Sequence, residues 1–338
     1  MTQTPFRIGT RGSPLALAQA YETRDNLIQA FPELGDEGAI EIVVIKTTGD
    51  KIQDRALMEV GGKGLFTKEI DDAMLAGEID IAVHSMKDVP TWMPDGIHLP
   101  CMLERRDVRD VFISNTSNSL WDLPEGAVVG TASLRRQSQI LARRPDMKVV
   151  TFRGTVQTRL KKLDGGDVDG TMLAAAGLKR LGMEEFITEA LDAEDFVPAV
   201  GQGAIGITCL VDDANTNVRL AALNHEQTFV RVTAERAFLA VLDGSCRTPI
   251  AAHAWYDGET TLHFHGLVAK PDGSEVHDVT RQGPASRIAA ESMGRDAGFE
   301  LKGQIGPDFL VTASVDVSPT TPPMKPAKST GDKAGDKD

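Results

Sequence analysis

The sequence predicts an α/β protein with mainly parallel sheets, followed by a smaller α+β domain. Short β-branched runs alternate with amphipathic stretches over the first two-thirds of its 338 residues, which is typical of parallel sheets covered by helices. The pattern breaks at 198–203, and from Asn224 the chain changes to a long helix followed by strands. A hydrophobic content of 41% with 25% charged residues gives enough apolar surface for two or three domains.

The first part of the chain begins with a short strand at 6–8 and a helix that Ser13 and Pro14 open, because serine is a favoured N-cap and proline fits the first helical turn. Segment 48–63 is rich in glycine and charge, has little periodicity and predicts a long mobile loop. The other elements expected here are a buried strand over 40–47, a helix over 65–76 and a strand over 79–83.

The rest of the chain predicts further strands and helices. Strand–helix units are expected over 127–143, 148–163 and 169–181, then a crossover at 198–203 and an apolar run over 204–209. The last part is expected to hold a helix over 224–242, a turn over 243–246, strands over 251–256 and 261–269, and a helix over 284–298. Residues 316–338 have almost no large apolar side chains and predict a disordered tail.

A positive field is concentrated in one segment of a chain whose formal net charge is −13. Within 131–162 only Asp146 is acidic, whereas nine residues are cationic: Arg135, Arg136, Arg143, Arg144, Lys148, Arg153, Arg159, Lys161 and Lys162. This segregation indicates an anionic ligand, and the planar forks of several arginines suit several carboxylates or phosphates. The alternative is that Arg143, Arg144, Lys161 and Lys162 form the solvated faces of two helices.

Arg135, Arg136 and Arg153 follow two turns of the same kind. An apolar run ends at Gly130, and Ser133 then stands at the expected N-cap of a helix, where backbone N–H groups favour anions. The arrangement recurs over 149–155. If the two strands are parallel neighbours, both turns converge on one crevice.

Segment 80–90 runs from a buried strand into a cluster of polar side chains, at the place where α/β enzymes carry catalytic groups. Asp88 suits a general acid/base or a counter-charge for a cationic intermediate, and Lys87 suits an anion anchor. The alternatives are that Asp88 caps a turn and Lys87 is solvated. His84 is more typical of a satisfied core residue than of a base.

The three cysteines, Cys101, Cys209 and Cys246, are odd in number and widely spaced, which argues against a disulfide framework and a metal site. We expect no metal. Cys246 stands in a small-residue turn before Arg247, which favours the thiolate. Cys101 and Cys209 lie in apolar runs, as core residues do.

Composition also narrows the partners and the compartment. No apolar run approaches the length of a membrane span, and residues 1–11 lack the apolar core of a secretory signal, so we expect a cytoplasmic protein without a membrane partner. An acidic chain with 5% aromatic residues is a poor candidate for binding nucleic acid.

Eight short segments of the chain form a recognisable series of sequence motifs. They are RIGTRGSPLALAQA from Arg7, VGGKGLFTKEI from Val60, DIAVHSMKDVPT from Asp80, GTASLRRQ from Gly130, FRGTVQTRL from Phe152, LAAAGLKRLG from Leu173, PAVGQGAIGI from Pro198 and GSCRTPI from Gly244. In number and order they resemble the hydroxymethylbilane synthases, also called porphobilinogen deaminases. The resemblance extends from about Arg7 to Ala313.

The resemblance implies a fold and an activity. Two lobes resembling periplasmic binding proteins, with mixed and mainly parallel sheets, would precede a C-terminal α+β domain. The implied domains are 5–102 with 204–222, then 103–203, then 223–315, with the tail at 316–338. The implied enzyme is a monomeric transferase of porphyrin and heme biosynthesis. It joins four porphobilinogen molecules head to tail with loss of ammonia and gives the linear tetrapyrrole hydroxymethylbilane.

The resemblance also implies a role for each candidate residue. Asp88 would be catalytic, and Cys246 would hold a dipyrromethane cofactor through a thioether. The other cofactor-binding positions are Arg135, Arg136, Ser133, Thr131, Lys87, Ser85 and Arg153. The substrate-binding positions are Arg11, Ser13, Arg153, Arg159, Arg180, Gln202 and Lys63.

Two other functions fit parts of this pattern. A two-lobed anion-binding protein would share the architecture and the arginines but would leave Cys246 without a role. A cysteine-nucleophile transferase acting on another polycarboxylate would form a transient adduct on Cys246. The implied synthase carries a permanent adduct built from its own substrate.

Overall fold

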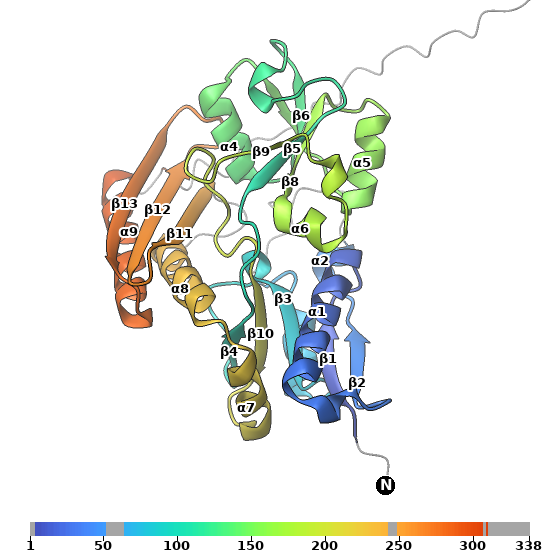
Figure 1. The fold of residues 1–338 in the computed structure, drawn as a ribbon. Coiled ribbons are helices and arrows are strands. Elements are labelled where there is room, and N and C mark those ends of the chain that lie inside the picture. The colour runs from blue at the N-terminus through green and yellow to red at the C-terminus, as the bar shows by residue number, and fades with distance from the viewer. Residues whose placement is uncertain (1–3, 52–63, 243–248, 307–308, 310–338) are drawn as a thin grey trace, which may run out of the picture.

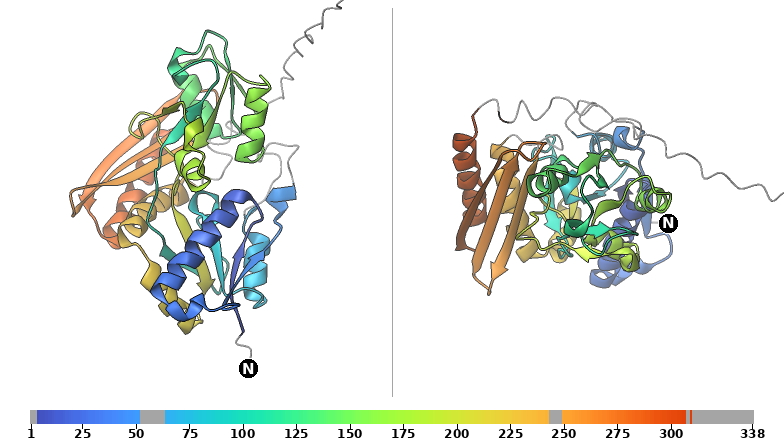
Figure 2. Two further views of the ribbon diagram at one scale, coloured as in Figure 1. Left: turned by 45° about the vertical axis from the view of Figure 1, so that its right-hand side comes forward. Right: turned by 90° about the horizontal axis from the view of Figure 1, so that it is seen from above.

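The computed structural model describes residues 4–51, 64–242, 249–306 and 309, and these residues form three β-sheets (Figure 1). Two sheets have five strands and the third has three. Figure 2 shows the three-stranded sheet and its helices beside the two lobes that the larger sheets form. The chain therefore has the α/β lobes and the C-terminal α+β part that its sequence predicts.

The first sheet has one antiparallel strand among parallel ones. Its order is β2 (Ile40–Val44), β1 (Phe6–Thr10), β3 (Ile81–Ser85), β10 (Ile205–Leu210) and β4 (Ile97–Met102). β1 pairs in parallel with β2 and β3, whereas β10 is antiparallel to both of its neighbours. The strand β10 comes from a distant part of the chain, so the first lobe is built from two segments.

The second sheet repeats this plan. Its order is β7 (Lys148–Val150), β6 (Val128–Gly130), β8 (Gly170–Ala174), β5 (Asp110–Ile113) and β9 (Glu189–Ala190). β6 pairs in parallel with β7 and β8, and β5 is antiparallel to its neighbours. The condition for two turns to converge is therefore met, because β6 and β7 are parallel neighbours.

Alternation of side chains buries both faces of each large sheet. Ile81 and Val83 pack on one face of the first sheet, and Ala82 packs on the other. Val111 and Phe112 divide in the same way in the second sheet, as the period of two in a strand requires. The helices that supply the covering side chains are α1 (Pro14–Ala30), α3 (Lys68–Leu75), α7 (Ala214–Leu223), α4 (Leu134–Arg143), α5 (Val156–Asp164) and α6 (Ala175–Arg180).

The C-terminal part packs two helices on one face of an antiparallel sheet. Its strands are β11 (Ile250–Asp257), β12 (Thr261–Ala269) and β13 (Val276–Pro284), and its helices are α8 (Glu226–Val241) and α9 (Arg287–Gln304). Phe238 of α8 meets Phe264 of β12 edge to face, with ring centroids 5.3 Å apart. This contact lies inside the largest hydrophobic cluster of this part.

Two crossover segments, 103–109 and 191–204, join the two lobes and lie against each other. The Leu103 N–H donates to Ile205 O, and the Arg106 N–H donates to Gly203 O, each at 3.1 Å. Gly203 has φ +86°, and a Cβ there would lie 2.7 Å from Arg106 O. Only glycine permits this close approach of the two segments.

Several boundaries differ from the sequence-based expectation. Segment 48–63 does not begin as a loop, because Thr48–Lys51 forms the helix α2; residues 52–63 lie outside the described residues. Strands β4, β5 and β13 were not expected, since their short or mixed sequences carry no clean alternation. The turn at 243–246 and the tail at 316–338 also lie outside the described residues, and the four domain boundaries remain predictions.

Candidate functional site

Polar groups of the first lobe follow the neighbouring parallel strands β1 and β3. Ser13, after β1, caps α1 by accepting from the Ala16 N–H at 3.2 Å. Ser85 ends β3 and donates to Gln19 Oε1 of α1 at 2.9 Å. A short 3₁₀ turn, Met86–Asp88, follows directly. The carboxyl ends of these strands therefore bring the predicted residues of this lobe together.

Arg11 lies between two carboxylates. Its Nε and NH2 groups donate to Asp50 Oδ1 at 3.1 and 2.5 Å, and its NH1 lies 3.6 Å from Asp88 Oδ2. Its guanidinium also lies 4.3 Å from the centre of the Phe66 ring. Burial opposes the charge of Asp50, but hydrogen bonds from Arg11 and Thr47 outweigh it and lower the pKa of that carboxyl. Arg11 therefore joins Asp88 and Asp50 through one guanidinium group.

In the second lobe, Thr131 and Ser133 shape the turn after β6. The Thr131 N–H donates to Val150 O of β7, and its hydroxyl accepts from the Ser133 N–H. Ser133 caps α4 by accepting from the Arg136 N–H at 3.4 Å. This cap fixes the first turn of α4, which carries both Arg135 and Arg136, as the sequence predicts.

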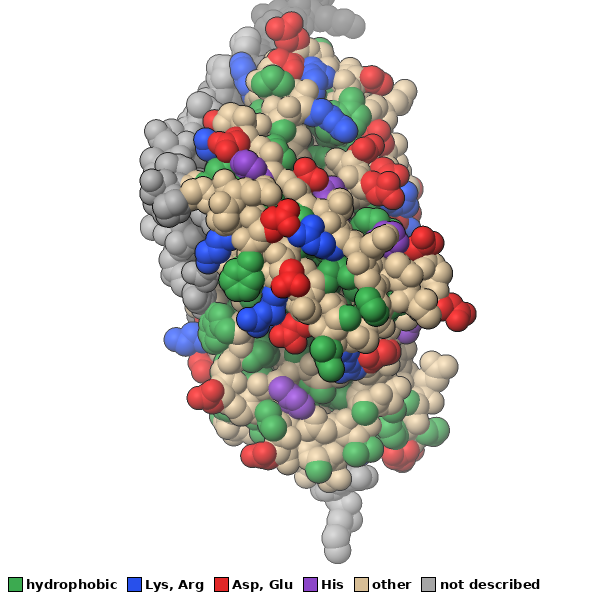
Figure 3. Space-filling model, turned by 90° about the vertical axis from the view of Figure 1, so that its left-hand side faces the viewer, with side chains coloured by type: hydrophobic (Ala, Val, Ile, Leu, Met, Phe, Trp, Pro, Cys, Tyr) green, Lys and Arg blue, Asp and Glu red, His purple; other side chains and the backbone are tan. Residues whose placement is uncertain are grey.

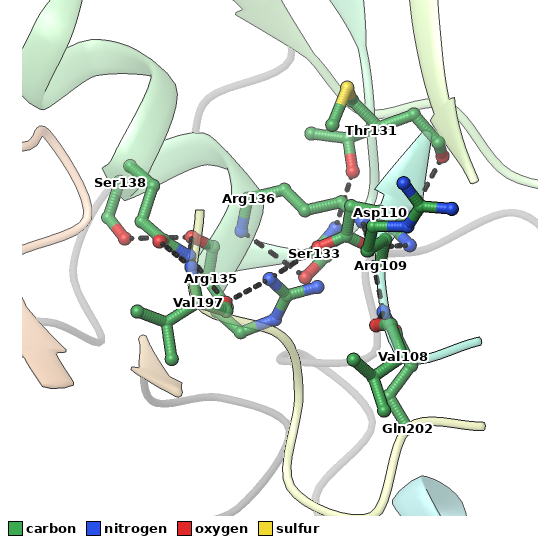
Figure 4. A network of polar contacts seen from close by, with 12 residues as sticks. Val108, Arg109, Asp110, Thr131, Ser133, Arg135, Arg136, Ser138, Val197 and Gln202 are labelled. Carbon is green, nitrogen blue, oxygen red and sulfur yellow. Dashed lines mark hydrogen bonds and ion pairs between the residues drawn. The ribbon is translucent and has the colours of Figure 1, made fainter. Parts of the chain in front are cut away.

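Both arginines converge on Asp110 at the start of β5 (Figure 4). Arg136 donates from Nε and NH2 to Asp110 Oδ1 at 3.0 and 2.7 Å, and from NH1 to Met172 O. Arg135 NH1 lies 2.7 Å from Asp110 Oδ2 and donates to Val197 O. Burial opposes the charge of Asp110, but the two guanidinium groups outweigh it and lower its pKa. One buried carboxylate therefore faces two cations, which leaves an excess positive charge.

Lys87 connects the two lobes electrostatically. Lys87 as a residue is exposed, although the protein around its ammonium group partly desolvates it. This desolvation lowers the pKa of Lys87 to about 8; Arg136 and Arg135 add to the effect, whereas Asp88 and Asp110 oppose it. A lysine of the first lobe is therefore within electrostatic range of the arginines of the second.

Arg153 and Arg159 extend the positive field of the second lobe. Arg159 Nε donates to Gly154 O at 3.0 Å, and Lys162 Nζ lies 3.4 Å from Arg153 O. Burial lowers the pKa of Arg159 to about 10, and the neighbouring Arg136 and Arg153 contribute. Mutual repulsion of this kind is relieved when an anion binds.

Arg180 and Gln202 lie where the lobes meet. Arg180, at the end of α6, donates from Nε to Glu22 of α1 at 2.9 Å and from NH2 to Gly203 O. Gln202 donates from Nε2 to Val108 O and to Asp110 Oδ1, at 2.7 and 3.1 Å. Both predicted residues thus hold the lobes and crossovers together in this structure.

Other sequence-based interpretations are resolved by their contacts. His84 is buried against the Thr208 hydroxyl, and burial lowers the pKa of the imidazole to about 4, as a neutral core histidine requires. Cys101 and Cys209 are buried, and the expectation that they are core residues is confirmed. Arg143, Lys161 and Lys162 are exposed, as the solvated-face interpretation expects. Arg144 is half-buried at the C-cap of α4 and bonds Asp146 and the carbonyls of Trp121 and Leu123.

Two predicted site residues, Cys246 and Lys63, lie outside the described residues. Sequence reasoning also missed the acidic partners of the predicted cations: Asp110, Asp50 and Glu22. A signal existed only for Asp110, which stands immediately before the apolar run of β5. A buried arginine pair needs a carboxylate, and strand ends supply such positions.

The polar atoms present fit a polycarboxylate ligand. Arg135 Nε is a buried donor, and no hydrogen-bond partner is recorded for it in the described part of the chain. Lys87 and Arg159 carry pKa values lowered chiefly by burial, so an incoming carboxylate would stabilise their charged forms. Fold and site together define a two-lobed α/β enzyme in which a few carboxylates lie among a larger number of cationic groups, suited to a substrate that carries several acids.

Comparison with models of known protein families identifies the family within this class of enzyme. The model described as "Porphobilinogen deaminase, dipyromethane cofactor binding domain" matches residues 6–218, and the model described as "Porphobilinogen deaminase, C-terminal domain" matches residues 229–303. The chain belongs to the porphobilinogen deaminase family, a family of transferases in tetrapyrrole biosynthesis.

Similar curated proteins carry the same name. The chloroplastic porphobilinogen deaminase of Oryza sativa subsp. japonica is 61% identical over 90% of this chain and 85% of its own length. The porphobilinogen deaminase of Paracoccus denitrificans is 56% identical over 91% of this chain and 97% of its own.

The similarity to solved structures and a search for membrane-spanning helices give two further observations. The methionine-binding protein MetQ resembles the chain with a TM-score of 0.40 and 11% identity, over 67% of this chain and 92% of its own, which is too distant to argue from. Within the described residues, we find no helix with both the length and the apolar character that crossing a membrane requires.

Proposed function

We propose that the chain carries out its family's polymerisation at the carboxyl ends of β1 and β3, with Asp88 as the catalytic residue. Four porphobilinogen molecules are joined head to tail, each with loss of ammonia, to give hydroxymethylbilane. The observation that carries the proposal is the position of Asp88, beside Arg11 of its own lobe and next to Lys87, on which the arginines of the other lobe act.

Asp88 acts on charge that develops during the reaction. As the C–N bond of the aminomethyl group breaks, its electron pair leaves with the protonated nitrogen as ammonia. The remaining azafulvenium shares its positive charge with the pyrrole nitrogen, and the Asp88 carboxylate stabilises it electrostatically. Attack by the next pyrrole carbon forms the new C–C bond, and that carbon then loses its proton.

The cationic groups act on the substrate's acids. Every porphobilinogen ring carries an acetate and a propionate, so each addition brings more carboxylates. We assign the binding of the cofactor's carboxylates to Arg135, Arg136, Lys87 and Arg153, with Thr131, Ser133 and Ser85 shaping the same strand ends. We assign the substrate's carboxylates to Arg11, Ser13, Arg153, Arg159, Arg180, Gln202 and Lys63.

Cys246 is proposed to hold the dipyrromethane through a thioether. When bound, this group supplies the pyrrole carbon to which the first substrate is added. The intact mass of the protein purified from cells tests the attachment. We expect an increment equal to two linked pyrrole units, located on the Cys246 peptide after digestion.

If the purified chain carries no mass increment, it is incubated with porphobilinogen. This distinguishes an apoprotein that lacked its precursor from a wrong assignment. Gain of the increment would support the proposal. Failure to gain it would favour a two-lobed anion-binding protein, and an adduct that is lost during turnover would favour a cysteine-nucleophile transferase.

Replacing Asp88 by Asn tests the catalytic assignment. The amide keeps the shape but cannot neutralise the azafulvenium, so we expect turnover to fall by about 10²-fold or more. The melting temperature should stay close to that of the protein without the substitution, because Asp88 is about one-third exposed. Turnover is measured as ammonia released per loaded enzyme, and full activity in Asp88→Asn would exclude this role.

We further propose that the chain acts as a monomer in the cytoplasm. Light scattering of the loaded protein tests the first statement, and a dimer at micromolar concentration would contradict it. Fractionation of the source cells tests the second. The relatives from Oryza sativa and Pisum sativum are named chloroplastic, so an organellar fraction is the alternative result.

A further inference from the structure

Arg236 of α8 reaches the turn that carries Asp88. Its NH1 donates to Val89 O at 3.1 Å, and its NH2 donates to Pro90 O at 2.7 Å. These are the two carbonyls directly after Asp88 in the chain. An arginine of the C-terminal part therefore holds the backbone next to the proposed catalytic carboxylate.

The charge of Arg236 has no carboxylate partner among the described residues, in contrast to Arg105, Arg135 and Arg136. Burial lowers the pKa of Arg236 to about 10. A guanidinium that is desolvated without an ion pair costs stability. Its planar fork, however, fixes two consecutive carbonyls at once, which a flexible lysine or an apolar side chain does less well.

Neighbouring contacts hold the same turn from other sides. Val232 and Phe229 of α8 pack in one cluster with Met86 and Val89. A Cβ at Gly201 would lie 2.9 Å from Met86 Cβ, so the crossover closes the turn from another side. The backbone of the turn is thus confined, while the Asp88 side chain remains about one-third exposed.

We propose that Arg236 is a positioning residue for Asp88, holding the 3₁₀ turn so that the carboxylate lies where the azafulvenium forms. The proposal rests on the proposed role of Asp88. It makes α8 part of the machinery for the reaction, although no atom of Arg236 needs to touch the substrate.

Three variants separate positioning from general stability. Arg236→Met removes both donors and keeps most of the volume; we expect kcat to fall about ten- to a hundredfold with KM for porphobilinogen nearly unchanged. Arg236→Lys keeps a charged donor and should recover part of kcat. The matched control is Arg231→Met on the same helix, which should keep full kcat. Among the described residues, Arg231 donates to Gln227 O and Thr228 of α8 and lies over the Tyr256 ring of β11, and none of these contacts involves the turn that carries Asp88.

Cofactor loading by intact mass and the melting temperature are measured on each variant, so that kcat refers to loaded, folded enzyme. Three results would overturn the proposal: a rise in KM of Arg236→Met with kcat unchanged, an equal fall of kcat in Arg231→Met, or no fall of kcat in Arg236→Met.

Chemical rescue gives a second test of the proposal. Arg236 lines a groove of about 530 Å³ between α8, α9 and the region of Thr91 and Leu99. In Arg236→Ala this groove gives an added guanidinium ion access to the vacated position. We expect millimolar guanidinium to raise kcat of Arg236→Ala severalfold and not to raise kcat of the enzyme that retains Arg236. A loss of kcat in Arg236→Ala that added guanidinium does not relieve would overturn the proposal.

The double variant Asp88→Asn with Arg236→Met distinguishes this inference from the proposed function. If Arg236 acts through Asp88, the double variant should be no slower than Asp88→Asn alone. A multiplicative loss would assign Arg236 to another step and overturn the inference. An active Asp88→Asn variant would instead refute the proposed catalytic role, whatever Arg236 does.

Discussion

Asp110 shows how a single buried carboxylate prepares a cationic site. It is fully buried, and it neutralises only one of the two guanidinium charges of Arg135 and Arg136. Holding both arginines on one acid keeps their forks ordered before any ligand arrives, which reduces the entropy lost on binding. The excess charge remains available to a ligand that carries carboxylates.

The pKa of Lys87 gives a prediction for pH dependence. Because partial desolvation by the surrounding protein and the nearby Arg136 lower the pKa of Lys87 to about 8, its ammonium loses its proton as the pH rises through that value. Attraction for carboxylates then weakens, so cofactor loading of the apoprotein by porphobilinogen should slow above that pH. In Lys87→Arg the guanidinium stays charged, and the decline should move to higher pH.

Loading is followed by intact mass against pH. Lys148→Arg, an exposed lysine on β7, is the control and should keep the profile of the unmodified protein. A profile in Lys87→Arg that coincides with that of the unmodified protein would show that Lys87 does not govern loading.

Helices α8 and α9 approach closely because of glycines on α9. A Cβ at Gly294 would lie 2.0 Å from Ala234 O, and one at Gly298 would lie 2.8 Å from Val241 Cβ. These two positions are four residues apart and therefore lie on one face of the helix. Any side chain there must push the helices apart.

Gly294→Ala should therefore destabilise the protein by about 1–3 kcal/mol, the usual cost of overpacking. Gly303→Ala on the same helix meets no atom within 4 Å and should be neutral or stabilise by up to about 1 kcal/mol. Urea unfolding of both variants measures the difference. Equal stability of the two would show that α8 and α9 adjust at no cost.

The whole molecule is tied together by a buried ion pair. Arg105 of the first crossover donates to Glu235 of α8 at 2.6 Å, and both side chains are fully buried. Glu235 also accepts from the N–H groups of Gly201 and Ala254, while Arg105 donates to Gln202 O. One pair thus joins both crossovers to the C-terminal part.

Removing one charge of this pair should cost about 3–5 kcal/mol, because the other is left buried without a partner. We expect this loss for Glu235→Gln in urea unfolding. Adding Arg105→Met should recover part of it, since no charge is left unpaired and the glutamine oxygen still accepts from one of the two backbone N–H groups that bond Glu235. A double variant less stable than the single one would mean that the pair is net stabilising beyond this desolvation effect.

The outer surface is different in character from this interior. On the face around β13 and α9, acidic and basic side chains are interspersed without a large patch of either sign (Figure 3). With a net charge of −13, such a surface favours solubility and disfavours nucleic acid.

The amino-acid pattern alone determined the α/β class, the caps at Ser13 and Ser133, and the concentration of cations after two strands, whereas the parallel pairing of these strands is seen only in the structure. These are local properties, because hydrophobic period, N-cap chemistry and charge segregation are written in neighbouring residues. The family resemblance, confirmed by the two family models, rests on the same short segments.

The tertiary structure decided which groups meet. Pairing of Arg11 with Asp50, of two arginines with Asp110 and of Arg236 with the turn after Asp88 joins residues 25 to 147 positions apart. No local pattern specifies such partners. They follow from the strand order, from the insertion of β10 into the first sheet, and from the need to satisfy each buried charge and donor once the lobes have packed.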